Sequence, residues 1–208
     1  GAHGGPGAVA FRARARQLAS RRMRRTVERE VKLEPGDAFA LPELPGTPLA
    51  SRIFTSTYHD TPPRSLARAG ITLRRRLENG VSLWQLKLPL AGPDARAELE
   101  VHGGPKGPPR QIADLLVAHV RHGPLEPVAT LRTRRKGVRV ADGSIAVADV
   151  VYDAVDVLAD GHAAGGFGEI EVELIDGRDE DLERLSQTLQ RAGAHASDGT
   201  PKLMRVLA

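Results

Sequence analysis

The feature that most constrains this chain is an alternation of charged or polar residues with apolar ones, repeated with a period of two. It occurs in five stretches: Val27 to Leu33, Ile71 to Leu77, Leu83 to Leu88, Arg96 to Val101 and Glu169 to Leu174. Successive side chains of a β-strand point to opposite faces, so this period predicts strands with one apolar and one ionic face. An open sheet would expose the ionic face to water, whereas a sheet closed with that face inward would enclose a charged tunnel.

The composition is that of a soluble globular protein. The chain has 208 residues, of which 40% are hydrophobic and 27% charged, so one fairly large domain is expected. No apolar run approaches the roughly 20 residues that cross a bilayer, so we expect no membrane partner. Cysteine is absent, which excludes disulfides and thiolate metal sites and is compatible with the cytoplasm, where we expect the protein.

The basic character of the chain is concentrated at its start. Residues 1–25 hold seven arginines and no acidic residue, and removing these seven charges from the net charge of +4 leaves −3 for residues 26–208. We therefore predict a disordered arginine-rich leader or added segment over residues 1–25 and one tunnel domain over 26–208. Nucleic acid is expected as a partner only through residues 12–25. The protein is expected to be a monomer or a homodimer.

The remaining pattern predicts about eight mostly antiparallel strands and three or four helices. Strands are expected over 26–34, 52–59, 71–78, 82–88, 95–102, 127–140, 144–157 and 168–175. Helices are expected after the Asp60-Thr61-Pro62-Pro63 start signal as far as Gly70, over 111–121 and over 179–192, with a short helix and a loop in 37–50. Asn79-Gly80 predicts a two-residue hairpin, and Gly165 to Gly168 are interpreted as a flexible turn.

Eight strands is near the number at which a barrel closes around a small ligand. The predicted fold class is therefore α+β: a closed eight-stranded antiparallel β-barrel with a charged interior and helices packed on its outside. Glutamates, arginines and lysines inside one tunnel would suit a polyanion held together with metal ions.

The first alternating stretch carries a candidate metal and phosphate motif. Glu28, Glu30 and Lys32 share one face of the expected strand. Two carboxylates at this spacing can both reach one hard divalent cation, and the lysine beyond them can reach a phosphate oxygen or a water. The alternative interpretation is an exposed edge whose charges prevent aggregation.

The second and third stretches supply candidate phosphate-binding cations. Arg74 and Arg76 face the same side, and Lys87 lies opposite the apolar residues of its own strand. Guanidinium groups bind phosphate through paired hydrogen bonds that a lysine cannot imitate. The alternative is a solvated surface hairpin.

Two further arginines, Arg132 and Arg134, are candidate phosphate ligands. Their alternation is less clean than that of the other stretches because Arg135 and Lys136 follow directly.

The acidic stretches balance these cations. Glu169, Glu171 and Glu173 lie along one face, where three like charges repel unless cations sit among them. Asp149 is expected on a neighbouring strand. The additional candidates are Arg96, Glu98 and Glu100, which repeat the pattern of the first strand with the signs reversed. A nearly neutral sum makes an ionic interior tolerable, because unpaired buried charges are very costly.

The ordered set of motifs resembles the CYTH superfamily, the triphosphate tunnel metalloenzymes, from residue 26 to about 205. The motifs are Glu28-x-Glu30-x-Lys32, Tyr58-His59-Asp60-Thr61, Leu73-Arg74-x-Arg76, Lys87, Arg96-x-Glu98-x-Glu100, Asp149, Glu171-x-Glu173 and Lys202. His59 departs from the family pattern, which often has an aromatic residue there. Lys202 departs in its surroundings, because it follows Thr200-Pro201 rather than a serine. No part of the chain resembles the CHAD helical domain that is often fused to bacterial members.

The resemblance implies an eight-stranded tunnel that binds a triphosphate-containing small molecule with Mg²⁺ or Mn²⁺. It implies substrate binding by Lys32, Arg74, Arg76, Lys87, Arg132, Arg134 and Lys202. It implies metal binding by Glu28, Glu30, Asp149, Glu171 and Glu173. Lys32 and Glu30 are the expected catalytic residues, and Arg96, Glu98, Glu100 and Glu169 are possible additions.

Several functions are compatible with this set. The first is hydrolysis of the terminal phosphate of a triphosphate, most simply inorganic triphosphate, because aromatic residues that could hold a base form only 3% of the chain. The alternatives of the same fold are a class IV-type adenylate cyclase and a thiamine or nucleoside triphosphatase. A non-catalytic polyphosphate- or nucleotide-binding module, or nucleic-acid binding through the leader, would be functions of a different class.

Overall fold

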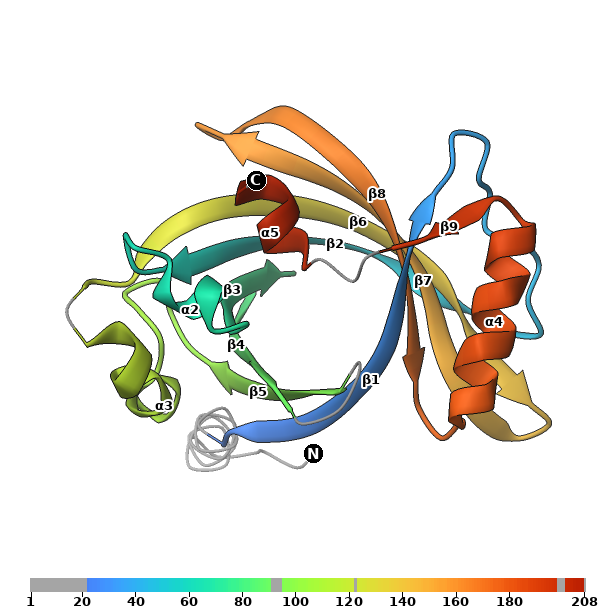
Figure 1. Cartoon of the computed structure of the whole chain (residues 1–208), viewed down its shortest axis with the longest axis horizontal. Coiled ribbons are helices and arrows are strands. Elements are labelled where there is room, and N and C mark those ends of the chain that lie inside the picture. The colour runs from blue at the N-terminus through green and yellow to red at the C-terminus, as the bar shows by residue number, and fades with distance from the viewer. Residues whose placement is uncertain (1–21, 91–94, 122, 198–200, 208) are drawn as a thin grey trace, which may run out of the picture.

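The computed structural model describes residues 22–90, 95–121, 123–197 and 201–207 (Figure 1). The strands are β1 Arg24–Pro35, β2 Gly46–Asp60, β3 Thr72–Glu78, β4 Val81–Pro89, β5 Ala95–His102, β6 Glu126–Asp142, β7 Ile145–Ala159, β8 His162–Leu174 and β9 Ala194–Ala196. The helices are α2 Ser65–Arg68, α3 Arg110–Val120, α4 Asp179–Arg191 and α5 Lys202–Leu207. Of the predicted leader, residues 1–21 lie outside the described residues.

Eight strands form a closed antiparallel barrel, as predicted. They follow the order β5-β4-β3-β2-β6-β7-β8-β1, and β1 pairs back onto β5 to close the ring seen in Figure 1. The first half of β1 pairs with β5, and its last residues pair with the short β9. Closure removes the free edges that an open sheet of this size would present.

The predicted hairpin at Asn79-Gly80 joins β3 to β4. Both residues have positive φ angles, 48° and 77°, which a tight two-residue turn between twisted strands requires.

The prediction of a flexible turn at Gly165 to Gly168 is wrong. The turn lies earlier, at Asp160 and Gly161, and the glycine-rich segment is part of β8. A Cβ at Gly166 would lie 2.6 Å from the carbonyl oxygen of Val155 on the neighbouring strand. Glycine here permits close backbone approach, which is a second use of this residue in strands.

The prediction of a short helix within 37–50 is also wrong. Residues 37–45 form no helix, and β2 begins at Gly46. Leu41 and Leu44, which suggested the helix, instead pack from this segment onto the apolar core beneath α4.

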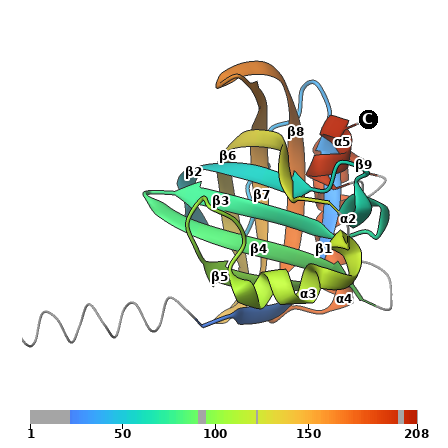
Figure 2. The ribbon, with the colours of Figure 1, turned by 90° about the vertical axis from the view of Figure 1, so that its left-hand side faces the viewer.

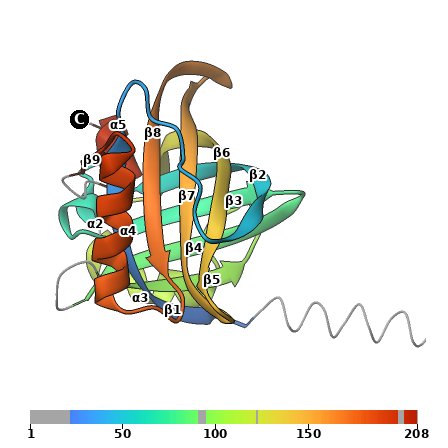
Figure 3. The same ribbon diagram turned by 90° about the vertical axis from the view of Figure 1, so that its right-hand side faces the viewer.

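The apolar faces of the strands point outward and are covered by helices. On one side, α2 and α3 place Leu66, Ile112 and Leu116 over Trp84 and Leu86 of β4 (Figure 2). On another side, leucines of α4 cover the apolar face of β7 and β8 (Figure 3). Burial of these faces under helices is the main stabilising contribution, and it leaves the opposite, charged faces inside the barrel.

The helix α2 begins and ends as its sequence signals indicate. The Asp60 carboxylate accepts hydrogen bonds from the backbone N–H groups of Leu66 and Ala67, at 2.9 Å each, and Gly70 follows the helix with a φ of 69°.

One end of the barrel is covered by α5. Its Leu203 packs against Tyr58, Leu131 and Val155, and the helix lies at the end opposite the β3–β4 turn (Figures 1 and 2).

In the part of the chain that the structure describes, no helix is long and apolar enough to span a membrane.

Candidate active site in the barrel interior

The interior of the barrel is a charged cavity of about 920 Å³. Among the described residues, ten cations line it: Arg24, Lys32, Arg52, Arg74, Arg76, Lys87, Arg96, Arg135, Arg139 and Lys202. Eight carboxylates line it as well: Glu28, Glu30, Glu78, Glu98, Glu100, Asp149, Glu171 and Glu173. The ionic faces of the strands therefore turn inward, and the described lining has a formal excess of two positive charges.

The structure brings most of the predicted site residues together in this cavity. Glu169 does not line it but lies directly beneath, in contact with Lys32 and Lys202. Arg132 and Arg134 are outside it.

Arg132 and Arg134 lie on the outer face of β6, and this prediction is corrected. The Arg134 side chain is 54% exposed and donates two hydrogen bonds to Asp156, at 3.0 and 3.2 Å. The inward position belongs to Arg135. Val138 and Val140 of the same strand face the helix-covered core. Counting back from them in steps of two would have placed Arg134 outside and Arg135 inside.

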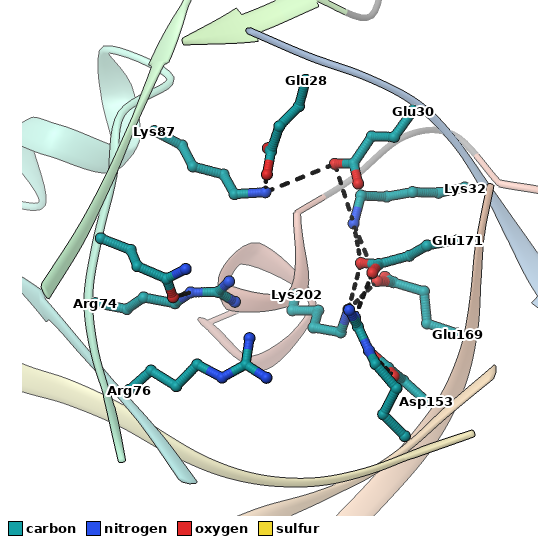
Figure 4. Close-up of polar contacts among 12 residues, drawn as sticks. Glu28, Glu30, Lys32, Arg74, Arg76, Lys87, Asp153, Glu169, Glu171 and Lys202 are labelled. Carbon is teal, nitrogen blue, oxygen red and sulfur yellow. Dashed lines mark hydrogen bonds and ion pairs between the residues drawn. The ribbon is translucent and has the colours of Figure 1, made fainter. Parts of the chain in front are cut away.

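The first half of the site is an ionic group that we call the lysine network. Its members are Lys32, Arg135, Asp153, Glu169, Glu171 and Lys202. The Lys202 ammonium contacts Asp153 at 3.1 Å and Glu171 at 2.6 Å, and it also donates to Glu169 (Figure 4). Lys32 donates to the same two glutamates at 3.0 and 2.9 Å. Arg135 holds Asp153 with two hydrogen bonds of 2.7 Å.

The charges of the lysine network balance, three cations against three carboxylates. Burial alone would raise the pKa of Glu171, but Lys202, Lys32 and Arg135 hold it well below its usual range. Burial would lower the pKa of Lys32, but the surrounding glutamates raise it well above its usual value. In this arrangement Lys32 is a cation that donates hydrogen bonds to both glutamates.

Asp153 was not among the predicted site residues. It is fully buried, at 0% exposure, and lies four residues after Asp149 on the same face of β7. Once Asp149 is taken as a candidate, the two-residue period of its strand also indicates Asp153. Asp149 itself is held by Arg139 through two hydrogen bonds of 2.8 Å.

The opposite half of the site is the arginine wall, formed by Arg52, Arg74 and Arg76. Gln85 and Tyr58 accept hydrogen bonds from Arg74, at 2.9 and 3.4 Å, and fix its orientation. The Arg76 guanidinium lies 3.5 Å above the centre of the Phe54 ring.

Arg76 has unused hydrogen-bond donors. Its Nη2 lies 3.0 Å from a Glu78 oxygen, but the geometry is not that of a hydrogen bond, and within the described residues neither Nε nor Nη2 has an acceptor. Burial and the nearby charges of Arg74 and Arg52 lower the pKa of Arg76 to about 10. Buried donors without acceptors are costly, so this position is suited to an anionic ligand.

A third group, the carboxylate wall, consists of Glu28, Glu30 and Glu173. Glu30 and Glu173 are register partners on β1 and β8, and Lys87 lies 2.5 Å from Glu28. Burial raises the pKa of Glu28 to about 7, and a hydrogen bond that protonated Glu28 donates to Glu98 adds to the rise. Burial and the charges of Glu28 and Glu30 likewise raise the pKa of Glu173 to about 7. This wall holds more negative charge than its neighbours neutralise.

The carboxylate wall fits a hard divalent cation that is shared with a ligand. Among the described residues, no three His, Asp or Glu side chains converge closely enough to enclose a metal ion by themselves. Mg²⁺ in proteins is commonly held by one or two carboxylates together with substrate phosphate oxygens. The donor chemistry therefore suits Mg²⁺ or Mn²⁺ bound jointly with a phosphate compound.

A closed antiparallel barrel with an ionic interior and an apolar, helix-covered exterior defines the class of charged-tunnel proteins. The chain belongs to the CYTH family, because the CYTH domain model matches residues 24–202. Members of this family are enzymes, triphosphatases and cyclases among them, that bind triphosphate substrates and generally use divalent metal ions.

The chain is also similar to a curated relative and, in its fold, to solved structures. An uncharacterised protein of Mycobacterium tuberculosis (strain ATCC 25618 / H37Rv) is 38% identical over 73% of this chain, which spans only 33% of that relative. A candidate adenylate cyclase from Bacillus halodurans has a TM-score of 0.56 at 16% identity, covering 88% of this chain and 99% of its own. A candidate adenylyl cyclase from Hippeastrum with a dominant triphosphatase activity has a TM-score of 0.52 at 17% identity, covering 85% and 93%. At these identities the structures show the fold alone.

Proposed function

We propose that this protein is a metal-dependent triphosphatase that hydrolyses the terminal phosphate of a triphosphate, with inorganic triphosphate as the preferred substrate. The observation that carries the proposal is that one cavity contains a wall suited to bind an anion and a second wall suited to bind a cation. Among the described residues Arg76 presents buried donors without acceptors, and in the carboxylate wall Lys87 pairs with Glu28 while the pKa values of Glu28 and Glu173 stay raised. A triphosphate with a divalent metal supplies both.

The cations of the cavity would bind the phosphate oxygens. Arg74 and Arg76 project from neighbouring inward positions of β3, and Arg74 is already fixed by Gln85 and Tyr58 (Figure 4). Guanidinium groups in fixed orientation bind phosphate through paired hydrogen bonds. Lys87, Lys32, Arg135 and Lys202 complete the proposed set.

Glu28, Glu30 and Glu173 would hold the divalent metal. When bound, Mg²⁺ or Mn²⁺ would neutralise developing charge and polarise the phosphoryl oxygens. Two predicted ligands, Asp149 and Glu171, are engaged by cations, so they would have to exchange partners before they reach a metal.

The reaction is an in-line displacement. The oxygen of a water molecule bonds to the terminal phosphorus, and the bond from that phosphorus to the bridging oxygen breaks. Pyrophosphate leaves with the electron pair, and the proton of the water passes to a cavity carboxylate. We assign Glu30 to orient this water. Lys32, whose ammonium lies 3.7 Å from the Glu30 carboxylate, would donate to the reacting phosphoryl oxygens as a cation.

The lining of the cavity favours a substrate without a base. Among its described residues Tyr58 is the single aromatic, and its hydroxyl is used by Arg74. A nucleotide or thiamine compound would need a flat surface on which to stack its ring.

The test is phosphate release from inorganic triphosphate, ATP and thiamine triphosphate, with and without Mg²⁺ or Mn²⁺. We expect metal-dependent release, greatest with inorganic triphosphate and strongly reduced in Glu30→Gln and Arg76→Ala. The outer variant Arg134→Ala is the control. Cyclic AMP among the products from ATP would indicate the cyclase instead. Binding without any release would indicate a non-catalytic module, and full turnover in both cavity variants would refute the proposed site.

A further inference from the structure

The mouth of the cavity contains a carboxylate that none of the motifs includes. Glu78 is the last residue of β3, next to the turn at the end of the barrel opposite α5 (Figure 2). It follows Arg74 and Arg76 in steps of two, so it shares their inward face.

Glu78 bridges two members of the arginine wall. Arg52 donates to it from Nε at 2.6 Å and from Nη2 at 2.7 Å, and Arg76 Nη2 lies 3.0 Å away. Within the described residues it is the one carboxylate that forms an ion pair with this wall. The hydrogen bonds from Arg52 lower the pKa of Glu78, so the side chain is an anion at neutral pH.

A carboxylate held by both fork nitrogens of an arginine occupies the position that two phosphate oxygens would take. Arg52 is therefore oriented toward the cavity but already engaged. A phosphate chain that extends outward from Arg74 past Arg76 reaches Glu78 next, where it meets a negative charge in place of a free guanidinium.

We propose that Glu78 is a specificity-determining residue that limits the site to short phosphate chains and disfavours linear polyphosphates of more than three phosphoryl groups. It does so by occupying the anion position at Arg52 and by placing its negative charge 3.0 Å from Arg76 Nη2. The inference rests on the proposed function only in taking a triphosphate as the reference ligand.

The experiment compares inorganic triphosphate with inorganic tetraphosphate in the parent and in Glu78→Gln. Glutamine keeps the shape of the side chain and a hydrogen bond to Arg52 but removes the charge. Binding is measured by calorimetry in Mg²⁺, and kcat/KM by phosphate release. We expect the tetraphosphate-to-triphosphate ratio of affinities to rise by about tenfold, since removing a like charge at close range has an effect of this order or larger.

Two further variants make the result specific. Asp156→Asn removes a carboxylate that pairs with Arg134 on the outer face, so it changes the net charge equally without touching the cavity, and its ratio should stay that of the parent. In the double variant Arg52→Ala with Glu78→Gln, the gain for tetraphosphate should be lost. Glu78→Ala, checked by thermal melting for intact folding, should repeat the shift of Glu78→Gln.

The outcomes separate this inference from the proposed function. A shifted binding ratio in a protein that releases no phosphate supports the role of Glu78 and refutes the triphosphatase. An unchanged ratio in Glu78→Gln, or the same shift in Asp156→Asn, overturns the role of Glu78 even if the protein hydrolyses triphosphate.

Discussion

The lysine network and the arginine wall face each other across one cavity, yet they treat their charges in opposite ways. In the network, Lys202 and Lys32 each contact both Glu169 and Glu171, and the six side chains are balanced. In the wall, two of the three guanidinium groups, those of Arg52 and Arg76, share the carboxylate of Glu78, and among the described residues Arg74 forms no ion pair. The formal charges of the network balance in the absence of a ligand, whereas those of the wall balance only when an anion binds.

The difference between the network and the wall indicates that buried charges have two roles in this barrel. A balanced buried group adds little net stability but is strongly destabilised when one partner is removed. A buried group whose charges do not balance lowers the stability of the free protein, and this stability is regained when a ligand of opposite charge binds. Such an arrangement is the electrostatic preorganisation that catalysis requires. The two halves should therefore respond differently to mutation.

The largest expected effect is on stability, from a single change in the lysine network. Glu171→Gln should leave the positive charges of Lys202, Lys32 and Arg135 without their common partner. We expect a loss of about 3–5 kcal/mol in the free energy of unfolding. Urea denaturation followed by fluorescence of Trp84 measures it. A loss below 1 kcal/mol would mean that the three cations do not depend on Glu171 for their stability.

Arg76→Ala should show the reverse profile. It removes buried donors that have no acceptor among the described residues and relieves repulsion with Arg74 and Arg52, which offsets the lost ion pair with Glu78 and the lost contact with Phe54, so the free energy of unfolding should change little. Triphosphate hydrolysis should fall by about 10²–10³-fold in kcat, the usual effect of losing one donor to a transition-state oxygen. Stability and activity falling together would remove the contrast between the two halves.

The carboxylate wall predicts an effect of intermediate size that depends on pH. The folded-state pKa of Glu28 and of Glu173 is about 7, above the ordinary value of 4.5. The folded state therefore binds more protons than the unfolded state between these values, and stability is lost as the pH rises through about 7. The melting temperature of metal-free protein should fall by roughly 5 °C from pH 5 to pH 8.

Added Mg²⁺ should reverse this fall, because a cation favours the ionised carboxylates. Glu28→Gln should flatten the pH dependence. The other groups that bear on these two carboxylates are Glu98, Lys87, Glu30 and Glu171. A pH profile that Mg²⁺ leaves unchanged would count against a metal at this wall.

The smallest effect should come from the outer face. Arg134→Ala removes an exposed pair with Asp156 and should change the free energy of unfolding by no more than about 0.5 kcal/mol, with activity unaltered. Arg135→Ala, one residue later, should reduce both the free energy of unfolding and the activity. Equal behaviour of the two variants in melting and phosphate release would contradict the placement of β6.

The fold could be predicted because the alternation of polarity is a local signal that five stretches repeat. Its failures are equally local. Charged residues occupy both odd and even positions in the run Arg132-Thr133-Arg134-Arg135-Lys136, so the run itself does not show which of its side chains point inward. Only Val138 and Val140, which pack in the helix-covered core, identify the inward side chains. Gly165 to Gly168 read as a turn because glycine marks both turns and close strand contacts, and only the strand partner distinguishes them.

Other parts of the site could not be predicted because they depend on distant contacts. Arg52 and Glu78 are 26 residues apart and meet only because β2 pairs with β3. The contact of Lys202 with Asp153 and Glu171 depends on where α5 docks on a finished barrel. Periodicity in one strand carries no information about either.

The docking of α5 also implies an order of assembly. Before that helix arrives, three carboxylates at the covered end of the barrel have two cations between them, and the barrel alone carries an excess negative charge there. A six-residue helix has too little length to persist by itself in water. The helix is therefore stabilised by the ion pairs of its first residue, Lys202, and by the apolar contacts of Leu203. The last described element of the chain is thus also the one that completes the interior.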